Sequence, residues 1–304
     1  MANHLPTPAP SPPPEGPPSI SAEINKATRK HHTELNRLII ERLPLALPPH
    51  ASDPALLGQG LATFSQTFFA FEEVWQQIED GKHALSRYDP DRAQEYDVVS
   101  SLAFLRPIGL ARSERLRKDL EYISKRTGKG VQRTGAVDKQ LAQQIQEIVN
   151  KKPHVLIAYA WVMYMAIFSG GRWIRQQLTN AGPEFWTGEP AAATDEKKAL
   201  MGTPALPGFS FLSFEGEQDG EDIKAEFKSR LAETEALLTE NERQDVIEAA
   251  QELFDHCIRL VGDLDKSVAR QRATSIVAPA LLLTLLFVLV LGLYWFDNYG
   301  YLRQ

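Results

Sequence analysis

The chain has 304 residues, with 33 Lys and Arg against 39 Asp and Glu, which gives a formal net charge of −6. This balance gives no support to a nucleic-acid partner, which favours a basic face. The single cysteine, Cys257, excludes an intrachain disulfide framework and is typical of a reducing compartment. With 43% hydrophobic residues, the chain is long enough for one core domain with appendages.

Proline dominates the N-terminal stretch "MANHLPTPAPSPPPEGPP". It lacks the apolar region of a secretory signal peptide, and its composition predicts an extended, disordered tail over residues 1–19. A ligand for an SH3-type domain is the alternative interpretation of the same prolines.

Apolar residues repeat at a helical period through most of the remaining chain. The predicted helices cover residues 22–43, 56–78, 110–126, 138–149, 153–178, 222–238 and 241–266. A loop rich in Gly, Pro and acidic residues is predicted over 180–221, and "TENE" at 239–242 is typical of a capping box with Thr239 as the cap. The sequence shows no strongly alternating strand, P-loop or dinucleotide-binding glycine pattern. We therefore predict an all-α, multi-helical bundle over residues 20–266.

One predicted helix contains the stretch "MAIFSGGRWIRQQL", residues 165–178, with Gly170 and Gly171 in its middle. Each glycine inside a helix costs about 0.5–1 kcal/mol relative to alanine. Two hypotheses explain the pair: close packing against another helix, or a bend that lets the backbone approach a flat group.

Two adjacent histidines, His31 and His32, lie on the first predicted helix. Di-iron bundles use Glu-x-x-His pairs, and none of the histidines in this chain has a Glu three residues earlier. A single histidine in an apolar bundle is better matched to an iron that is already held in a porphyrin. An ordinary core or surface histidine pair is the alternative.

An uninterrupted apolar segment covers residues 276–296, which is the length needed to cross the hydrocarbon core of a bilayer. Three basic residues at 266–272 precede it and only Arg303 follows it, so the N-terminal part is expected to face the cytosol. We predict a basic linker at 267–275, a transmembrane tail anchor at 276–296 and a short lumenal tail at 297–304. A buried core helix is the alternative.

Four stretches in the same order resemble the heme oxygenases, and most of all the fungal, membrane-anchored branch. "KATRKHHTELN" resembles the segment with the proximal ligand, and "PHVLIAYAWVMYMAIFSGGRWIRQQL" resembles the distal helix. "LPGFSFLSF" and "IKAEFKSRLAE" resemble the aromatic stretch and the basic helix that follow. The resemblance covers roughly residues 20–266 and implies a heme-oxygenase-like bundle.

The resemblance also implies individual roles. His32 would be the iron ligand, and Gly170 and Gly171 would let the distal helix bend over the haem. The remaining haem-contacting positions that it implies are Arg29, Trp161, Lys224, Lys228 and Phe254.

The implied reaction opens haem to biliverdin, carbon monoxide and ferrous iron, with dioxygen and electrons from a membrane-bound, NADPH-dependent reductase. Haem is then both substrate and cofactor, and the expected location is the endoplasmic reticulum membrane. Arg172, Arg175 and Arg230 are candidate docking residues for the reductase, or ordinary solvated charges.

The sequence departs from the family at several positions. Ile167 stands where many members have a carboxylate that organises water for proton delivery, Ala166 replaces a glycine, and Asn25 replaces a basic residue. Tyr159 and Tyr164 are candidate replacements as proton sources, or core tyrosines.

Alternatives to catalysis therefore remain open. The first is a non-catalytic haem-binding protein that senses, buffers or carries haem. A thiaminase-like protein with Cys257 as its nucleophile is a third hypothesis, against which a buried structural thiol is weighed.

Overall fold

The computed structural model describes residues 18–83, 85, 88–128, 135–189 and 206–299. Within these ranges the side chains of 135–138, 272 and 274–299 are not described. The predicted disordered tail therefore lies outside the described residues except at 18–19, and the predicted lumenal tail lies outside them from residue 300 onward.

The described residues form helices and contain no strand, which confirms the all-α prediction. The α-helices are α1 (Ile20–Ala27), α2 (Arg29–Arg42), α3 (Ala55–Glu79), α4 (Ala93–Leu105), α5 (Ser113–Thr127), α6 (Gly135–Lys151), α7 (Leu156–Phe168), α8 (Gly170–Asn180), α9 (Gly182–Thr187), α11 (Glu221–Glu235) and α12 (Glu240–Tyr299). Short 3-10 turns are η1 (Leu43–Ala46), η3 (Pro90–Arg92), η4 (Pro153–Val155) and η5 (Ser210–Leu212). The sequence analysis missed α4, and it assigned α9 to a loop.

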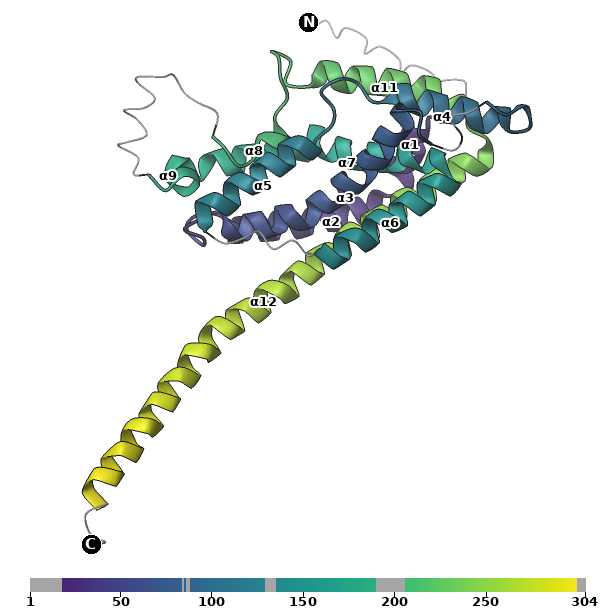
Figure 1. Ribbon diagram of the computed structural model, residues 1–304. Coiled ribbons are helices and arrows are strands. Elements are labelled where there is room, and N and C mark those ends of the chain that lie inside the picture. Colours follow the sequence, from purple (N-terminus) through teal and green to yellow (C-terminus); the bar gives the residue numbers. More distant parts are fainter. Residues whose placement is uncertain (1–17, 84, 86–87, 129–134, 190–205, 300–304) are drawn as a thin grey trace, which may run out of the picture.

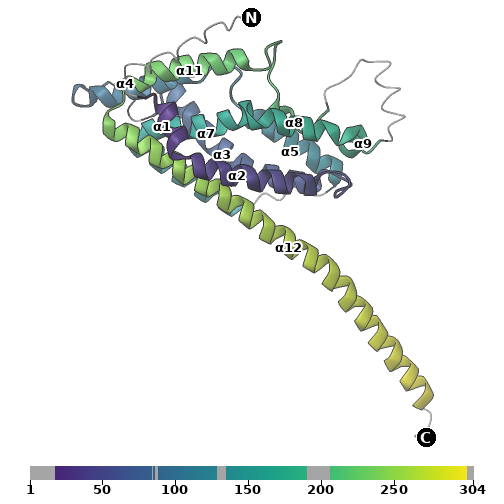
Figure 2. The same ribbon diagram turned by 180° about the vertical axis from the view of Figure 1, so that it is seen from behind.

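Helix α3 lies at the centre of the bundle and packs against α4, α5, α6, α7 and α12. The first part of α12 runs along α1, α2 and α7, whereas α11 packs on α4 (Figure 1). Seen from behind, the rest of α12 extends away from the bundle as one long helix (Figure 2). Aromatic residues of α3 and α7, including Phe71, Trp75 and Tyr164, are fully buried and form the centre of the core.

The predicted helix over 22–43 is wrong as a single element, because Thr28 separates α1 from α2. Thr28 is buried, and its hydroxyl donates a 2.8 Å hydrogen bond to the carbonyl oxygen of Ile24. Its backbone has φ −96° and ψ 3°, outside the regular helical range. A side chain that competes for helical carbonyls in this way bends or ends a helix.

The predicted helix over 153–178 also divides, into η4, α7 and α8. Ser169 joins α7 to α8 with φ −101° and ψ −75°, and the two parts are bent by 43°. Gly170 follows the bend directly, which agrees with the hypothesis that the glycine pair allows a bend.

Helix α12 begins as the sequence predicts. The Thr239 hydroxyl accepts a 3.3 Å hydrogen bond from the Glu242 amide, and the Glu242 carboxylate accepts a 2.8 Å bond from the Thr239 amide. This reciprocal pair is the predicted capping box. The helix then continues for 60 residues, so that the predicted linker 267–275 is part of it.

The backbone of the predicted span 276–296 belongs to α12, but its side chains lie outside the described residues. Within the described part of the chain, no single helix has the length and apolar character to cross a membrane. Pro153–Phe168 and Gly170–Asn180 meet that test only as a bent pair, and α7 is a core helix.

Candidate functional site

An exposed stripe runs along one side of the α7–α8 unit. Helix α7 is almost entirely buried, yet Ala166, Ser169 and Gly170 are exposed, and Trp173 is 40% exposed. These positions follow the spacing i, i+3, i+4 and i+7, which places them on one face of a helix. Three of the four have small side chains or none, so the backbone itself is accessible from this face.

The two glycines have different surroundings. A Cβ atom at Gly170 would meet nothing within 4 Å outside its own helix, whereas one at Gly171 would lie 3.2 Å from the side chain of Leu212. Gly171 is therefore needed for close packing, and Gly170 leaves open space. Gly171 therefore packs closely against η5, while the approach of a flat group to the open side of Gly170 stays a prediction.

The adjacent histidines of α2 also differ. His31 is half-buried, its Nε2 lies 3.6 Å from Oδ1 of Asp255 on α12, and its Nδ1 is buried without a partner. His32 is exposed, and its imidazole meets the edge of the buried Phe254 ring at a centroid distance of 6.1 Å. His32 is thus the histidine that remains accessible to an iron atom.

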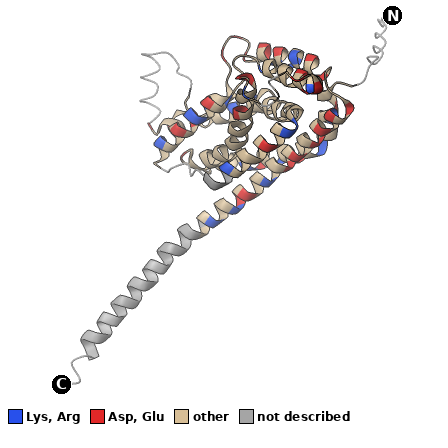
Figure 3. Ribbon diagram, turned by 45° about the vertical axis from the view of Figure 1, so that its right-hand side comes forward, with Lys and Arg blue, Asp and Glu red and all other residues tan. Residues whose placement is uncertain are grey.

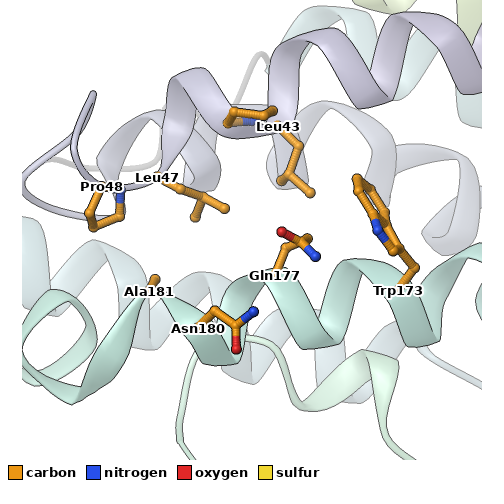
Figure 4. A pocket seen from close by; sticks show the side chains of 8 residues that line it. Leu43, Leu47, Pro48, Trp173, Gln177, Asn180 and Ala181 are labelled. Atoms are coloured by element: carbon orange, nitrogen blue, oxygen red, sulfur yellow. The ribbon is translucent and has the colours of Figure 1, made fainter.

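Residues 43–48, which follow α2, and residues on and just after α8 line a cavity of about 150 Å³ (Figure 4). Leu43, the first residue of η1, and Leu47, which directly follows η1, face Trp173 and Gln177 of α8 across it. The lining is mainly apolar. Leu43 lies three turns beyond His32 and Gln177 lies two turns beyond Gly170, so the two sides of the cavity belong to the segments that follow the two predicted haem-facing residues.

Three predicted or substituted positions meet beside α11. The Trp161 indole donates a 3.0 Å hydrogen bond to the side-chain oxygen of Asn25, and the Lys228 ammonium lies 6.0 Å from the centre of the same ring. Arg29 is exposed at the first position of α2, one turn before His32. Lys224 lies 3.4 Å from Glu221. No contact joins these basic side chains to Gly170 or His32.

The position of the missing family carboxylate is buried. Ile167 is 6% exposed and packs within the core. The nearby tyrosines also belong to the core. Burial raises the pKa of Tyr159 to about 12, and burial together with the Glu72 carboxylate raises the pKa of Tyr164 well above its usual value. Neither phenol is an accessible proton donor at neutral pH.

Sequence reasoning missed the buried carboxylate of Glu72 on α3. Its two oxygens accept hydrogen bonds of 2.8 and 2.9 Å from the amides of Arg112 and Ser113, at the start of α5. One oxygen also accepts a 2.8 Å bond from the Tyr164 hydroxyl. This carboxylate satisfies the free amides of a helix N-terminus from a distant helix. The available signal was an acidic residue between Phe71 and Trp75 on an apolar helix face.

The candidate docking arginines all have carboxylate partners. Arg172 binds Glu221 at 2.6 Å, Arg175 binds Asp219, and Arg230 binds Glu226. Figure 3 shows acidic and basic residues interspersed over the outer helices of the described chain. These arginines therefore do not form a uniformly basic surface.

Cys257 is 3% exposed on α12, and burial raises the pKa of its thiol to about 12. A thiol in this state holds almost no thiolate at neutral pH, and the thiolate is the nucleophilic form. The finding supports the structural interpretation of this residue over the thiaminase-like one.

The residues fit a flat, iron-containing ring. The exposed imidazole of His32 on α2 would hold the iron, the ring of Phe254 would supply an apolar contact, and the open side of Gly170 would allow a close approach of backbone. Among the described residues, no group of three or more His, Cys, Asp or Glu side chains could hold a bare metal ion. A single accessible histidine beside an apolar ring is a side-chain arrangement that can hold iron within a porphyrin.

The class of protein defined by this fold and site is a helical haem-binding protein, and the comparison with known families agrees. The Heme oxygenase family profile matches residues 18–263. The chain belongs to the heme oxygenase family.

Individual relatives are distant. The chain is 23% identical to the heme-binding protein HMX1 of Saccharomyces cerevisiae over 83% of this chain and 77% of that protein. It is 24% identical to rabbit (Oryctolagus cuniculus) heme oxygenase 2, over 58% of this chain and half of that protein.

Solved structures agree on the fold. Heme oxygenase-2 from Synechocystis sp. PCC 6803, in complex with heme and NO, superposes with a TM-score of 0.59 at 16% identity and covers 84% of this chain and 88% of its own. Heme oxygenase 2 from Chlamydomonas reinhardtii superposes with a TM-score of 0.55 at 18% identity, over 81% of this chain and 97% of its own.

Proposed function

We propose that this protein is a heme oxygenase, which converts haem to biliverdin, carbon monoxide and ferrous iron with dioxygen and reductase-supplied electrons. One observation carries the proposal. This chain belongs to the heme oxygenase family and combines an exposed histidine on α2 with an exposed face at Ala166 and Gly170, on the otherwise buried α7 and at the start of α8.

His32, Phe254 and Gly170 have different roles in holding haem. His32 would hold the iron, and its T-shaped contact with the ring of Phe254 would limit rotation of the imidazole. Gly170 lets α8 lie close to the opposite face of the ring. Haem supplies the site of dioxygen activation when it is bound.

Basic side chains fix the rotation of haem about its axis. Lys228, Lys224 and Arg29 pair with the propionate carboxylates, because an ammonium or guanidinium group near the edge of the site binds them by charge. The Lys228 ammonium lies over the Trp161 ring, whose indole donates a hydrogen bond to Asn25.

Proton delivery distinguishes this chain from many relatives. Ile167 offers no carboxylate, and the buried tyrosines retain their protons. We expect protons to arrive through water at the exposed Ser169–Gly170 backbone, more slowly than through a side chain of matched pKa.

The alternative function is a non-catalytic haem-binding protein that acts as sensor, buffer or carrier. Two observations favour it: the apolar residue at position 167, and the similarity to a yeast relative that is named a heme-binding protein. The two functions share the site and differ only in whether the ring is opened.

A single-turnover assay separates them. The full-length protein in detergent is loaded with ferric haem and supplied with a reductase and NADPH in air, with catalase present. Loss of the Soret band, formation of biliverdin and capture of carbon monoxide are the expected results. An intact ring after complete reduction would contradict the oxygenase and support the binder. Ile167→Asp is the companion variant, because it places a carboxylate at the position where many family members have one.

We also propose that residues 276–296 anchor the protein in the endoplasmic reticulum membrane with the helical domain in the cytosol. The apolar length of the segment and the basic residues before it support this placement. A membrane-bound reductase is the corresponding electron donor.

A further inference from the structure

Residues 209–221, here called the brace, contact both sides of the bend between α7 and α8. The Phe214 ring stacks on Phe168, the last residue of α7, with centroids 4.7 Å apart and ring planes at 9°. Leu212 packs against Gly171, in the first turn of α8. The bend at Ser169 therefore lies between two fixed apolar contacts.

Ion pairs extend the contact along α8. Arg175 donates to both carboxylate oxygens of Asp219, one bond being 2.8 Å long. Arg172 donates to the Asp219 carbonyl at 3.2 Å and to Glu221 at 2.6 Å. A two-bond guanidinium–carboxylate pair fixes direction as well as distance. The Arg175 hydrogen bond lowers the pKa of Asp219, so the pair stays charged at neutral pH.

The brace is itself held by α5. The buried Arg112 side chain donates 2.9 and 3.3 Å hydrogen bonds to the carbonyls of Ser213 and Phe211. The Phe211 amide donates a 2.8 Å bond to the buried carboxylate of Asp119. Because these contacts fix the brace to the core, its ion pairs can hold α8 in place.

Asp219 is the residue at which the backbone departs from ordinary geometry. Its φ of +48° lies in the left-handed region, which Asp and Asn tolerate better than most side chains. Gly220 follows with φ +82°, and a Cβ there would lie 2.5 Å from Phe214. This turn aims the Asp219 carboxylate at α8.

We propose that Asp219 is a positioning residue, whose pairing with Arg175 holds α8 at the angle at which Gly170 faces haem. The haem-related part of this inference rests on the proposed function. The same turn connects α8 to α11. Carboxylate oxygens of Glu221 lie 2.6 Å from the guanidinium of Arg172 on α8 and 3.4 Å from the ammonium of Lys224 on α11.

Asp219→Asn tests the proposal, because asparagine tolerates the left-handed backbone but lacks the charge and keeps only one of the two acceptor oxygens. Glu217→Gln, an exposed acid in the same segment, is the matched control. The first measurement is backbone amide exchange in the haem-free, full-length protein in detergent. We expect amides in the first two turns of α8 to exchange roughly tenfold faster in Asp219→Asn, since charged hydrogen bonds contribute at this order. Amides of α3 and all amides of Glu217→Gln stay as in the wild type.

The second measurement is transfer of ferric haem from the loaded protein to apomyoglobin. Loss of the pair is expected to speed release roughly tenfold in Asp219→Asn and to leave Glu217→Gln unchanged. Arg175→Lys keeps the charge but loses the two-bond geometry, so it is expected to give an intermediate effect and provides a second route if Asp219→Asn folds poorly.

Three results would overturn the positioning role: unchanged exchange in α8, a uniform acceleration over all helices, or faster exchange with unchanged haem release. Failure of the proposed function has a different signature. In that case the wild type would leave the haem ring intact in the single-turnover assay, whereas the exchange difference between Asp219→Asn and Glu217→Gln in haem-free protein would persist.

Discussion

The hydroxyl of Tyr164 donates a 2.8 Å hydrogen bond to Glu72, and both side chains are buried in the core. Tyr164 lies on the distal helix, so it was a candidate proton source, but its hydroxyl is committed to a carboxylate that also caps α5. Its role is therefore to join α3, α5 and α7.

Tyr164→Phe is expected to lower the free energy of unfolding by about 1–3 kcal/mol, because it removes a buried hydrogen bond to a charged group. Haem affinity and the solvent isotope effect on turnover should stay unchanged. Denaturant unfolding and single-turnover rates check this, with Tyr159→Phe on the same helix as the control. A loss of turnover with unchanged stability would instead place Tyr164 on the proton path.

His32→Ala is expected to abolish strong iron coordination and shift the Soret band of the haem complex, because His32 is the exposed imidazole of α2. His31→Ala should keep the wild-type spectrum, since His31 faces Asp255. Visible spectra of the two variants with ferric haem provide the measurement. The opposite pattern would show that His31 is the ligand.

Gly170→Leu and Gly171→Leu are expected to fail in different ways. At Gly170 the new side chain meets open space, so helix content and thermal stability should be kept while haem binding is lost. At Gly171 the new side chain would collide with Leu212, because a Cβ atom at this position would lie only 3.2 Å from the Leu212 side chain. Overpacking of this kind lowers the free energy of unfolding by about 1–3 kcal/mol. Circular dichroism melts and haem titrations separate the two. Retained haem binding in Gly170→Leu would disprove the distal-face assignment.

Stability is expected to fall at alkaline pH through Cys257. Burial raises the pKa of this thiol from 9.0 to about 12, so the folded state holds the proton more tightly than the unfolded state. The resulting stabilisation is complete below about pH 9 and is lost as the pH rises towards 12. Urea unfolding between pH 7 and 11 should show a shallower decline in Cys257→Ala. Equal slopes in both proteins would contradict the assignment.

Deletion of the residues after Lys266 is expected to give a fragment that is released from membranes and still binds haem. The last buried core residue of α12 in the described chain is Val261, so the deletion removes no core contact there. Membrane flotation and haem titration of the fragment beside the full-length chain check this. A fragment that still floats with membranes would contradict the tail anchor.

The fold class and most of the helices could be predicted from the sequence, because apolar periodicity and the capping box are local signals. The break at Ser169 could not, since the segment that packs against it, at Leu212, is distant in sequence. The break at Thr28 rests on a local hydrogen bond to the Ile24 carbonyl, so the threonine itself was the available signal. Helix α4 was missed although its residues Val98, Val99, Leu102 and Leu105 are buried, because adjacent apolar residues blur a helical period.

For the candidate site, local motifs indicated His32, Gly170 and Lys228 through the family resemblance. They could not distinguish the roles of Gly170 and Gly171, which differ only by the neighbour Leu212 on a distant segment. The pairing of Arg175 with Asp219 was equally hidden, because 44 residues separate the partners.

Helix α12 carries Phe254 beside His32 and continues without a break to residue 299. Residue 276 follows Phe254 by 22 positions, so it lies about 33 Å further along the axis. Because an unbroken helix transmits rotation about its axis, whatever orients the far end of α12 also sets the orientation of the His32–Phe254 face. Haem and its electron donor would then approach the helical domain from one fixed direction.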